Sequence, residues 1–217
     1  INSQPGGSIA NGGASNCSVS FRPTSLGVKT AKIIIINNDS DEGVYEITLT
    51  GTAVASKLSA IVITPSPDFV YSSLIDYENY QADNITSPTN GFKLVSYTLR
   101  DGGTGTPSDV DNLPTILTDL TFKITNWTNI RSLSLYDGAT EVGIDQDVTG
   151  EFVTFTDLNI IAADGGTKQF EVLATFSESV VDSQYLILQI TAAETDVTGS
   201  NFAAANAGGV STASNRN

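Results

Sequence analysis

The sequence predicts an all-β protein of tandem immunoglobulin-like β-sandwiches, of which the first is incomplete. Short runs of β-branched or alternating apolar residues recur along the chain. Clusters of Gly, Asn, Asp and Pro separate these runs at intervals of about 8–12 residues, which is the spacing of strands in a sandwich. No stretch carries the apolar repeat of a long helix.

The strands are expected in two series. In the first series, residues 17–21 are apolar at odd positions, and residues 28–36 and 44–50 flank the polar turn 37–43, which predicts a hairpin. In the second series, the apolar set of residues 92–99 moves from even to odd positions, so we expect a β-bulge there. Residues 157–163 favour a short edge strand or a turn. The other strands of the second series are expected at residues 58–63, 69–74, 116–124, 130–136, 152–155, 167–176 and 185–192.

The two series divide the chain into three expected regions. These are a partial immunoglobulin-like unit at residues 1–55, a β-sandwich module at residues 58–200, and a Gly/Ala/Ser/Asn-rich tail at residues 201–217 that leads to a next domain. An immunoglobulin-like domain has about 100 residues, so the first region holds about half of one. We expect its missing strands either upstream, since the chain starts at Ile1 and has no Met, or in another chain that donates a strand.

Composition excludes several classes of function. The net charge is −14, and the ten Lys and Arg residues are spread along the chain, so we expect no nucleic-acid binding and no attraction to anionic lipid. No apolar run is long enough for membrane insertion. The sequence has no His to serve as a general base, and we expect no enzymatic activity. The single cysteine, Cys17, excludes an internal disulfide and is expected to be buried with Val19 and Phe21.

The best candidate site is an acidic loop that we expect to bind Ca²⁺ through Asp101, Asp109, Asp111 and Asn112. Carboxylate and amide oxygens are the ligands that Ca²⁺ prefers, and the glycines between these residues let several oxygens converge on one point. The spacing is not that of an EF-hand. The alternative is a solvated turn in which the Asp side chains cap backbone amides. A weaker candidate of the same kind lies in the hairpin turn, at Asp39, Asp41 and Glu42.

Other chemical signals have simpler explanations. Trp127 is the only Trp, and we expect it to pack in the core or at a domain edge rather than to form a sugar platform. Acidic residues are abundant, but no aromatic cluster surrounds a pair of them as in a glycosidase. N-x-Ser/Thr triplets arise easily by chance in a chain of this composition, and they begin at Asn16, Asn38, Asn84 and Asn126.

Three segments of the first region carry a resemblance to a known family. They are Cys-Ser-Val-Ser-Phe-Arg-Pro-Thr at 17–24, Asn-Asn-Asp-Ser-Asp-Glu at 37–42 and Leu-Thr-Gly-Thr-Ala at 49–53. In this order they resemble the second half of a choice-of-anchor D repeat, a relative of the ASPM/SPD-2/Hydin immunoglobulin-like domains. The resemblance implies a repeat domain of a large bacterial surface protein.

The second region is similar to a module of giant secreted proteins of Bacteroidota. The matching segments are residues 86–88, 99–103, 109–115 and 203–209. The resemblance implies export by the type IX system to the cell surface, with a role in adhesion or gliding. The partners it implies are neighbouring domains of the same protein, other copies of it, surface glycans or secretion machinery.

Three functions remain open from the sequence. The leading hypothesis is a non-catalytic structural or adhesive segment of a large secreted bacterial surface protein. The second is a filament subunit assembled by β-strand donation, with residues 33–36 or 58–63 as donor. The third is an accessory module of a secreted polysaccharide-degrading enzyme.

Overall fold

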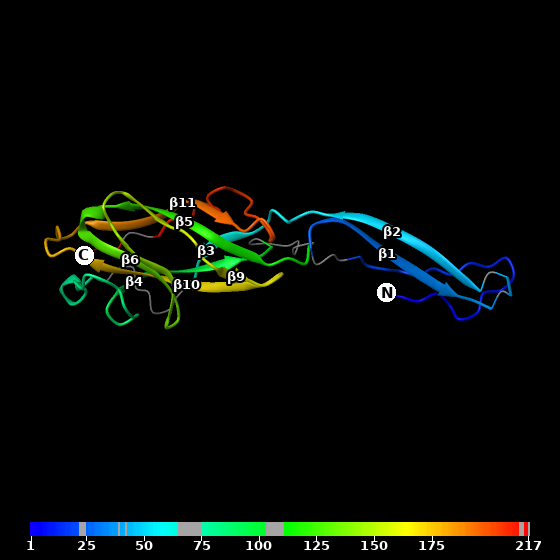
Figure 1. Cartoon of the computed structure of the whole chain (residues 1–217). Coiled ribbons are helices and arrows are strands. Elements are labelled where there is room, and N and C mark those ends of the chain that lie inside the picture. Colours follow the sequence, from blue (N-terminus) through cyan, green and yellow to red (C-terminus); the bar gives the residue numbers. More distant parts are fainter. Residues whose placement is uncertain are drawn as a thin grey trace. The chain divides into compact units, whose positions relative to one another are not determined.

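The computed structural model describes residues 1–21, 25–38, 40–41, 43–64, 75–102, 111–212 and, for their backbone, 215–216. The chain divides into two compact units, Ile1–Ala53 and Val54–Asn217, which we call unit 1 and unit 2 (Figure 1). No helix among the described residues is long and apolar enough to cross a membrane.

Unit 1 is built on one β-hairpin. Strand β1, Gly27–Ile36, pairs antiparallel with β2, Val44–Ala53, in a register that is unbroken from end to end. The hairpin predicted around the polar turn is therefore confirmed. None of the residues described in unit 1 is buried, and large apolar side chains such as Ile34, Ile36 and Val44 are more than half exposed. The described part of unit 1 thus has a sheet but no buried core.

The strand expected at residues 17–21 is wrong. This segment forms only an isolated antiparallel bridge between Ser18 and Ser3, and Cys17 is exposed rather than buried. Val19 and Phe21 each keep more than a third of their surface exposed, although the Phe21 ring lies against Gly51. The prediction required an opposing sheet to bury the odd positions, and no second sheet forms among the described residues of unit 1.

Unit 2 contains two antiparallel sheets (Figure 1). The first sheet runs in the order β3 (Ala60–Ile63), β4 (Phe92–Arg100), β10 (Thr167–Phe176), β6 (Ile130–Asp137) and β7 (Thr140–Asp147). The second runs in the order β12 (Asn215–Arg216), β11 (Tyr185–Thr195), β5 (Thr115–Thr125) and β8 (Phe152–Phe155), with β9 (Ile160–Ala162) also paired to β5. The helices described are two 3₁₀ turns, η1 (Tyr77–Asn79) and η2 (Trp127–Asn129).

The two sheets of unit 2 bury a common apolar core, which confirms the all-β, sandwich-like fold. Tyr97 of the first sheet stacks on Phe122 of the second with ring centroids 5.8 Å apart, and Phe170 and Phe155 extend this aromatic cluster. All four rings are almost completely buried. Trp127 is half-buried against the same core, as expected. Burial of these side chains is the main source of stability of unit 2.

The bulge predicted in β4 is also confirmed. Val172 of β10 lies opposite Val95, whereas the next residue, Leu173, lies opposite Lys93, so Leu94 is the extra residue. Leu94 and Val95 are consequently both buried, although they are adjacent. The strand expected at residues 69–74 lies outside the described residues.

Residues 201–212 differ from the tail that we expected. They pack along unit 2, where Ala207 is buried and Ile61 N–H donates to its carbonyl oxygen at 2.9 Å. On the other side Ala193 N–H donates to Ala205 O at 2.8 Å. Small side chains permit this close approach of backbones, so the composition that suggested a linker here serves packing instead.

Candidate functional site

A polar cluster joins the beginning of unit 2 to its end. We call Ser56, Ser59, Asp111, Ser200 and Asn201 the terminal latch. Its backbone part comprises bonds from Asn201 N–H to Ser56 O (2.8 Å), from Ser59 N–H to Asn201 O (3.2 Å) and from Ala203 N–H to Ser59 O (3.3 Å). The bridge between Ser59 and Phe202 is parallel. The segment that enters unit 2 and the segment that leaves β11 therefore run side by side in the same direction.

Asp111 is the centre of the terminal latch. Its carboxylate accepts hydrogen bonds from Ser56 N–H, from Leu113 N–H at 2.9 Å and from the Ser200 hydroxyl at 3.1 Å. Ser200 is fully buried and Ser56 nearly so. Hydrogen bonds to a charged acceptor are about twice as strong as neutral ones, so one side chain fixes three chain segments to one another.

Asp101 extends the terminal latch into the sandwich. Its carboxylate is buried and accepts the Thr115 hydroxyl at 2.5 Å and Gly165 N–H at 2.7 Å. The hydroxyls of Thr115 and Ser59 lie 2.6 Å apart, which links Asp101 to the entering segment. A buried carboxylate is tolerated when its oxygens are hydrogen-bonded, and Asp101 meets this condition.

Two members of the predicted Ca²⁺ site, Asp101 and Asp111, therefore lie in one hydrogen-bonded region. Asn112 is half-buried beside them, and Asp109 lies outside the described residues. Among the residues that the structure describes, no three acidic or Cys side chains form a group able to hold a metal ion. The contacts of Asp101 and Asp111 fit the alternative in which Asp side chains cap backbone amides, and Ca²⁺ binding by this loop stays a prediction. In the weaker site, Asp41 is exposed, while Asp39 and Glu42 lie outside the described part of the chain.

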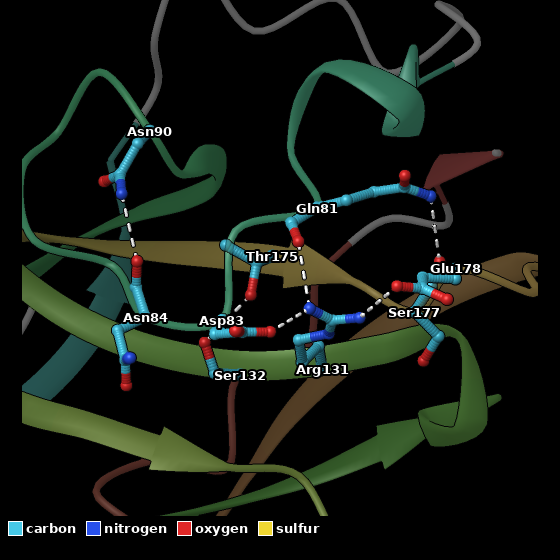
Figure 2. A network of polar contacts seen from close by, with 9 residues as sticks. All are labelled: Gln81, Asp83, Asn84, Asn90, Arg131, Ser132, Thr175, Ser177 and Glu178. Carbon is cyan, nitrogen blue, oxygen red and sulfur yellow. Dashed lines mark hydrogen bonds and ion pairs between the residues drawn. The ribbon is translucent and has the colours of Figure 1, made fainter.

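A second polar network fastens the loop before β4 to the first sheet (Figure 2). Arg131 of β6 donates to Gln81 O at 3.0 Å and forms ion pairs with Asp83 and, at 3.6 Å, with Glu178. Gln81 also donates from its side chain to Ser177 O at 3.3 Å. The Arg131 side chain is three-quarters buried, whereas Asp83 and Glu178 are exposed, so the bond from Arg131 to Gln81 O is the firmer part of this anchor.

Asp145 of β7 lies under the same loop. It accepts Ile85 N–H at 3.4 Å. Burial raises the pKa of Asp145, and the charges of Glu141 and Asp147 raise it further, while hydrogen bonds from Ser132 and Ile85 N–H act in the opposite direction. The ionised form of Asp145 is thus less favourable in folded unit 2 than in water.

The Tyr136 hydroxyl donates to the carbonyl oxygen of Ile85 at 3.1 Å. Burial also raises the pKa of this hydroxyl, with Glu141 and Asp145 adding to the effect. Tyr136 therefore stays protonated and keeps the loop attached from a second side.

The contacts described in these networks are hydrogen bonds and ion pairs that hold parts of the chain together. The described carboxylates at both sites hold backbone amides, hydroxyls or a guanidinium. The sequence has no His that would activate a Ser or Thr as a nucleophile. Sequence reasoning missed Ser56, Thr115, Ser200 and Arg131, because each acts through contacts with residues far away in the chain and no local pattern marks it.

Comparison with known proteins adds no family: no family model matches the chain, and no curated protein matches it.

Proposed function

We propose that this chain is a non-catalytic, load-bearing segment of a large secreted bacterial surface protein. The observation that carries the proposal is the parallel arrangement of the terminal latch, in which Ser56 and Ser59 pair with Asn201 and Ala203. A tension applied to the two ends of unit 2 pulls these parallel segments in opposite directions. Their hydrogen bonds are then loaded together in shear instead of being broken one after another.

The rest of unit 2 supports this role. Residues 201–212 bond both to Ile61 of the first sheet and to Ile190 and Ala193 of the second, so both sheets share the load near the chain's end. Asp111 adds side-chain bonds to the entering segment and to Ser200. A domain that transmits force between neighbours needs such fastened ends and needs no reactive group. The resemblance to repeats of bacterial surface proteins favours the same location, outside the cell.

Single-molecule force spectroscopy of unit 2, with handles at Val54 and at the chain's end, tests the proposal. Asp111→Ala removes the carboxylate that accepts from Ser56 N–H and Leu113 N–H and leaves the buried Ser200 hydroxyl only its longer bond to Leu113 O at 3.3 Å, at a cost of about 3 kcal/mol. We expect a clearly lower unfolding force for this variant than for the native chain. The matched control is Asp147→Ala on β7, an exposed carboxylate remote from the terminal latch, which is expected to leave the force unchanged. Equal forces for all three proteins would contradict the proposal.

Calcium would add to this role if the loop at residues 101–112 binds it, because an ion between its carboxylates would stiffen the same end of unit 2. We expect thermal melts in Ca²⁺ and in a chelator to differ by several degrees in that case. Equal midpoints, unchanged by Asp109→Ala, would exclude the site.

A further inference from the structure

The outer edge of β1 is a candidate site for strand pairing, although the strand carries Lys29 and Lys32. The β1–β2 sheet has two strands, and no described residue pairs with the outer edge of β1. Asn37 N–H donates to Gly43 O in the hairpin register, so odd-numbered residues bond to β2 and even-numbered N–H groups face outward. Edge strands are usually blocked by Pro, by a bulge or by charges. Residues 33–36 of β1 are four isoleucines with none of these devices.

Unit 1 also lacks the burial that a hairpin needs. A two-stranded sheet is only marginally stable in water, and a third strand or a packed face is required for independent stability. None of the described residues of unit 1 is buried, and Ile34 and Ile36 are 57% and 80% exposed. An added strand along β1 would pair with the outward N–H and C=O groups and cover part of these side chains.

The distribution of charge indicates what the added strand is. Unit 1 carries three basic and four acidic residues, a net charge of −1, so unit 2 carries −13 of the chain's −14. Two copies of unit 1 therefore meet with little repulsion, whereas two copies of unit 2 repel each other. A basic partner would be drawn to unit 2, but a nearly neutral isoleucine edge suits another edge of the same kind, which a second copy supplies.

We propose that two copies of this chain associate through their β1 strands, antiparallel about a two-fold axis. With Ile33 opposite Ile33 of the second copy, residues 30–36 pair along their whole length, and each outward N–H of an even residue donates to an outward carbonyl oxygen of an even residue in the second copy. Lys32 then lies opposite Ile34 of the second copy. It does not face another lysine, and its charge is balanced by Glu46 of its own hairpin at 2.7 Å. The result is one continuous four-stranded sheet.

This inference does not depend on the proposed function, since strand pairing belongs to unit 1 and force resistance to unit 2. Sedimentation velocity of the whole chain at rising concentration tests it first. We expect a reversible dimer that strengthens with salt, because salt screens the repulsion between copies of unit 2. A chain that stays monomeric at several hundred micromolar in 0.3 M salt would overturn the proposal.

A charge variant tests the surface. Ile34→Lys places a lysine opposite Lys32 of the second copy and should weaken the dimer at least about tenfold. The substitution should not destabilise the hairpin, since residue 34 lies opposite Glu46 of β2, whose carboxylate attracts a lysine. The control is Ile144→Lys on β7, where the native side chain is 76% exposed, and its dimer should keep native affinity. Equal weakening by both variants would contradict pairing through β1.

A disulfide trap tests the register. In the variant Cys17→Ser with Ile33→Cys, the two new cysteines lie opposite each other in a non-hydrogen-bonded pair, at about 4.5 Å between Cα atoms, which a disulfide can span. We expect a covalent dimer on mild oxidation. The control, Cys17→Ser with Ile144→Cys, should stay monomeric under the same conditions. Failure of the first variant to cross-link, or equal cross-linking of both, would overturn the arrangement.

Discussion

At the scale of the residue, Asp145 shows that partly burying one carboxylate among others is unfavourable. Burial, Glu141 and Asp147 raise its pKa in the folded state, so the folded chain binds this proton more tightly than the unfolded chain. The ionised carboxylate therefore lowers the stability of the folded state at pH values above its raised pKa. This penalty disappears as the pH falls below the pKa of the unfolded state, which is about 4. Asp145→Asn is therefore expected to raise the melting temperature at pH 7, and the gain should vanish near pH 3.

The control for this prediction is Asp182→Asn, an exposed carboxylate whose charge does not contribute to the pKa shift of Asp145. It should change the melting temperature much less, because water already stabilises that charge. Melts across pH 3–8 separate the two variants. A loss of stability in Asp145→Asn that is equal at every pH would mean that its hydrogen bonds with Ser132 and Ile85 outweigh the desolvation of its charge.

At the scale of the element, the turn after β11 depends on a residue without a side chain. A Cβ on Gly199 would overlap the carbonyl oxygen of Pro114, a backbone atom that cannot move aside without disturbing β5. Gly199 N–H closes the turn on Asp196 O at 3.1 Å, and the next residue, Ser200, donates its N–H to that Pro114 oxygen at 3.0 Å. The turn is thus packed directly against the terminal latch.

Gly199→Ala is expected to lower the free energy of unfolding by about 2 kcal/mol, the usual cost of overpacking. The measurement is chemical denaturation of the whole chain. Gly150→Ala is the matched control, because a Cβ there meets nothing within 4 Å, and it should be neutral or slightly stabilising. A neutral Gly199→Ala would show that the turn can move without cost and is not held by the terminal latch.

Strands were predictable where the burial of one face requires apolar residues in a regular pattern along the sequence. Strands β4, β5, β6, β10 and β11 each bury apolar residues on at least one face, and their positions were predicted within a few residues. Strand β7 was missed because its sequence, Thr-Glu-Val-Gly-Ile-Asp-Gln-Asp, is acidic and places Ile144 outward. Cys17 was predicted incorrectly because local alternation does not tell whether an opposing sheet exists.

The candidate site was predictable only in part. Asp101 and Asp111 were recognised, with Asp109 and Asn112, as oxygen-bearing residues of one acidic loop, which is a local signal. Their partners Ser56, Gly165 and Ser200 lie far away in sequence and come together only through the sheet order. Hydrogen bonds of this kind depend on tertiary geometry, so the sequence pointed to these carboxylates but not to the particular amides and hydroxyls from which they accept.

At the scale of the whole molecule, the two proposals give the two units different tasks. Unit 2 has a buried apolar core, hydrogen-bonded loops and nearly all of the negative charge, which fits the proposed element that resists unfolding. Unit 1 has an open hairpin edge and almost no net charge, which suits association. A protein that joins copies through one unit and carries tension through the other fits the proposed structural segment of a surface assembly.

The direction of pulling tests the central claim most directly. With Cys17 replaced by Ser, one pair of handles at Val54 and the chain's end loads the terminal latch in shear. A second pair, at Val54 and the exposed Val197, pulls from one end of the terminal latch and peels its bonds in sequence. We predict a distinctly higher unfolding force for the first pair. Equal forces, or a higher force in the peeling direction, would contradict a load-bearing role for the terminal latch.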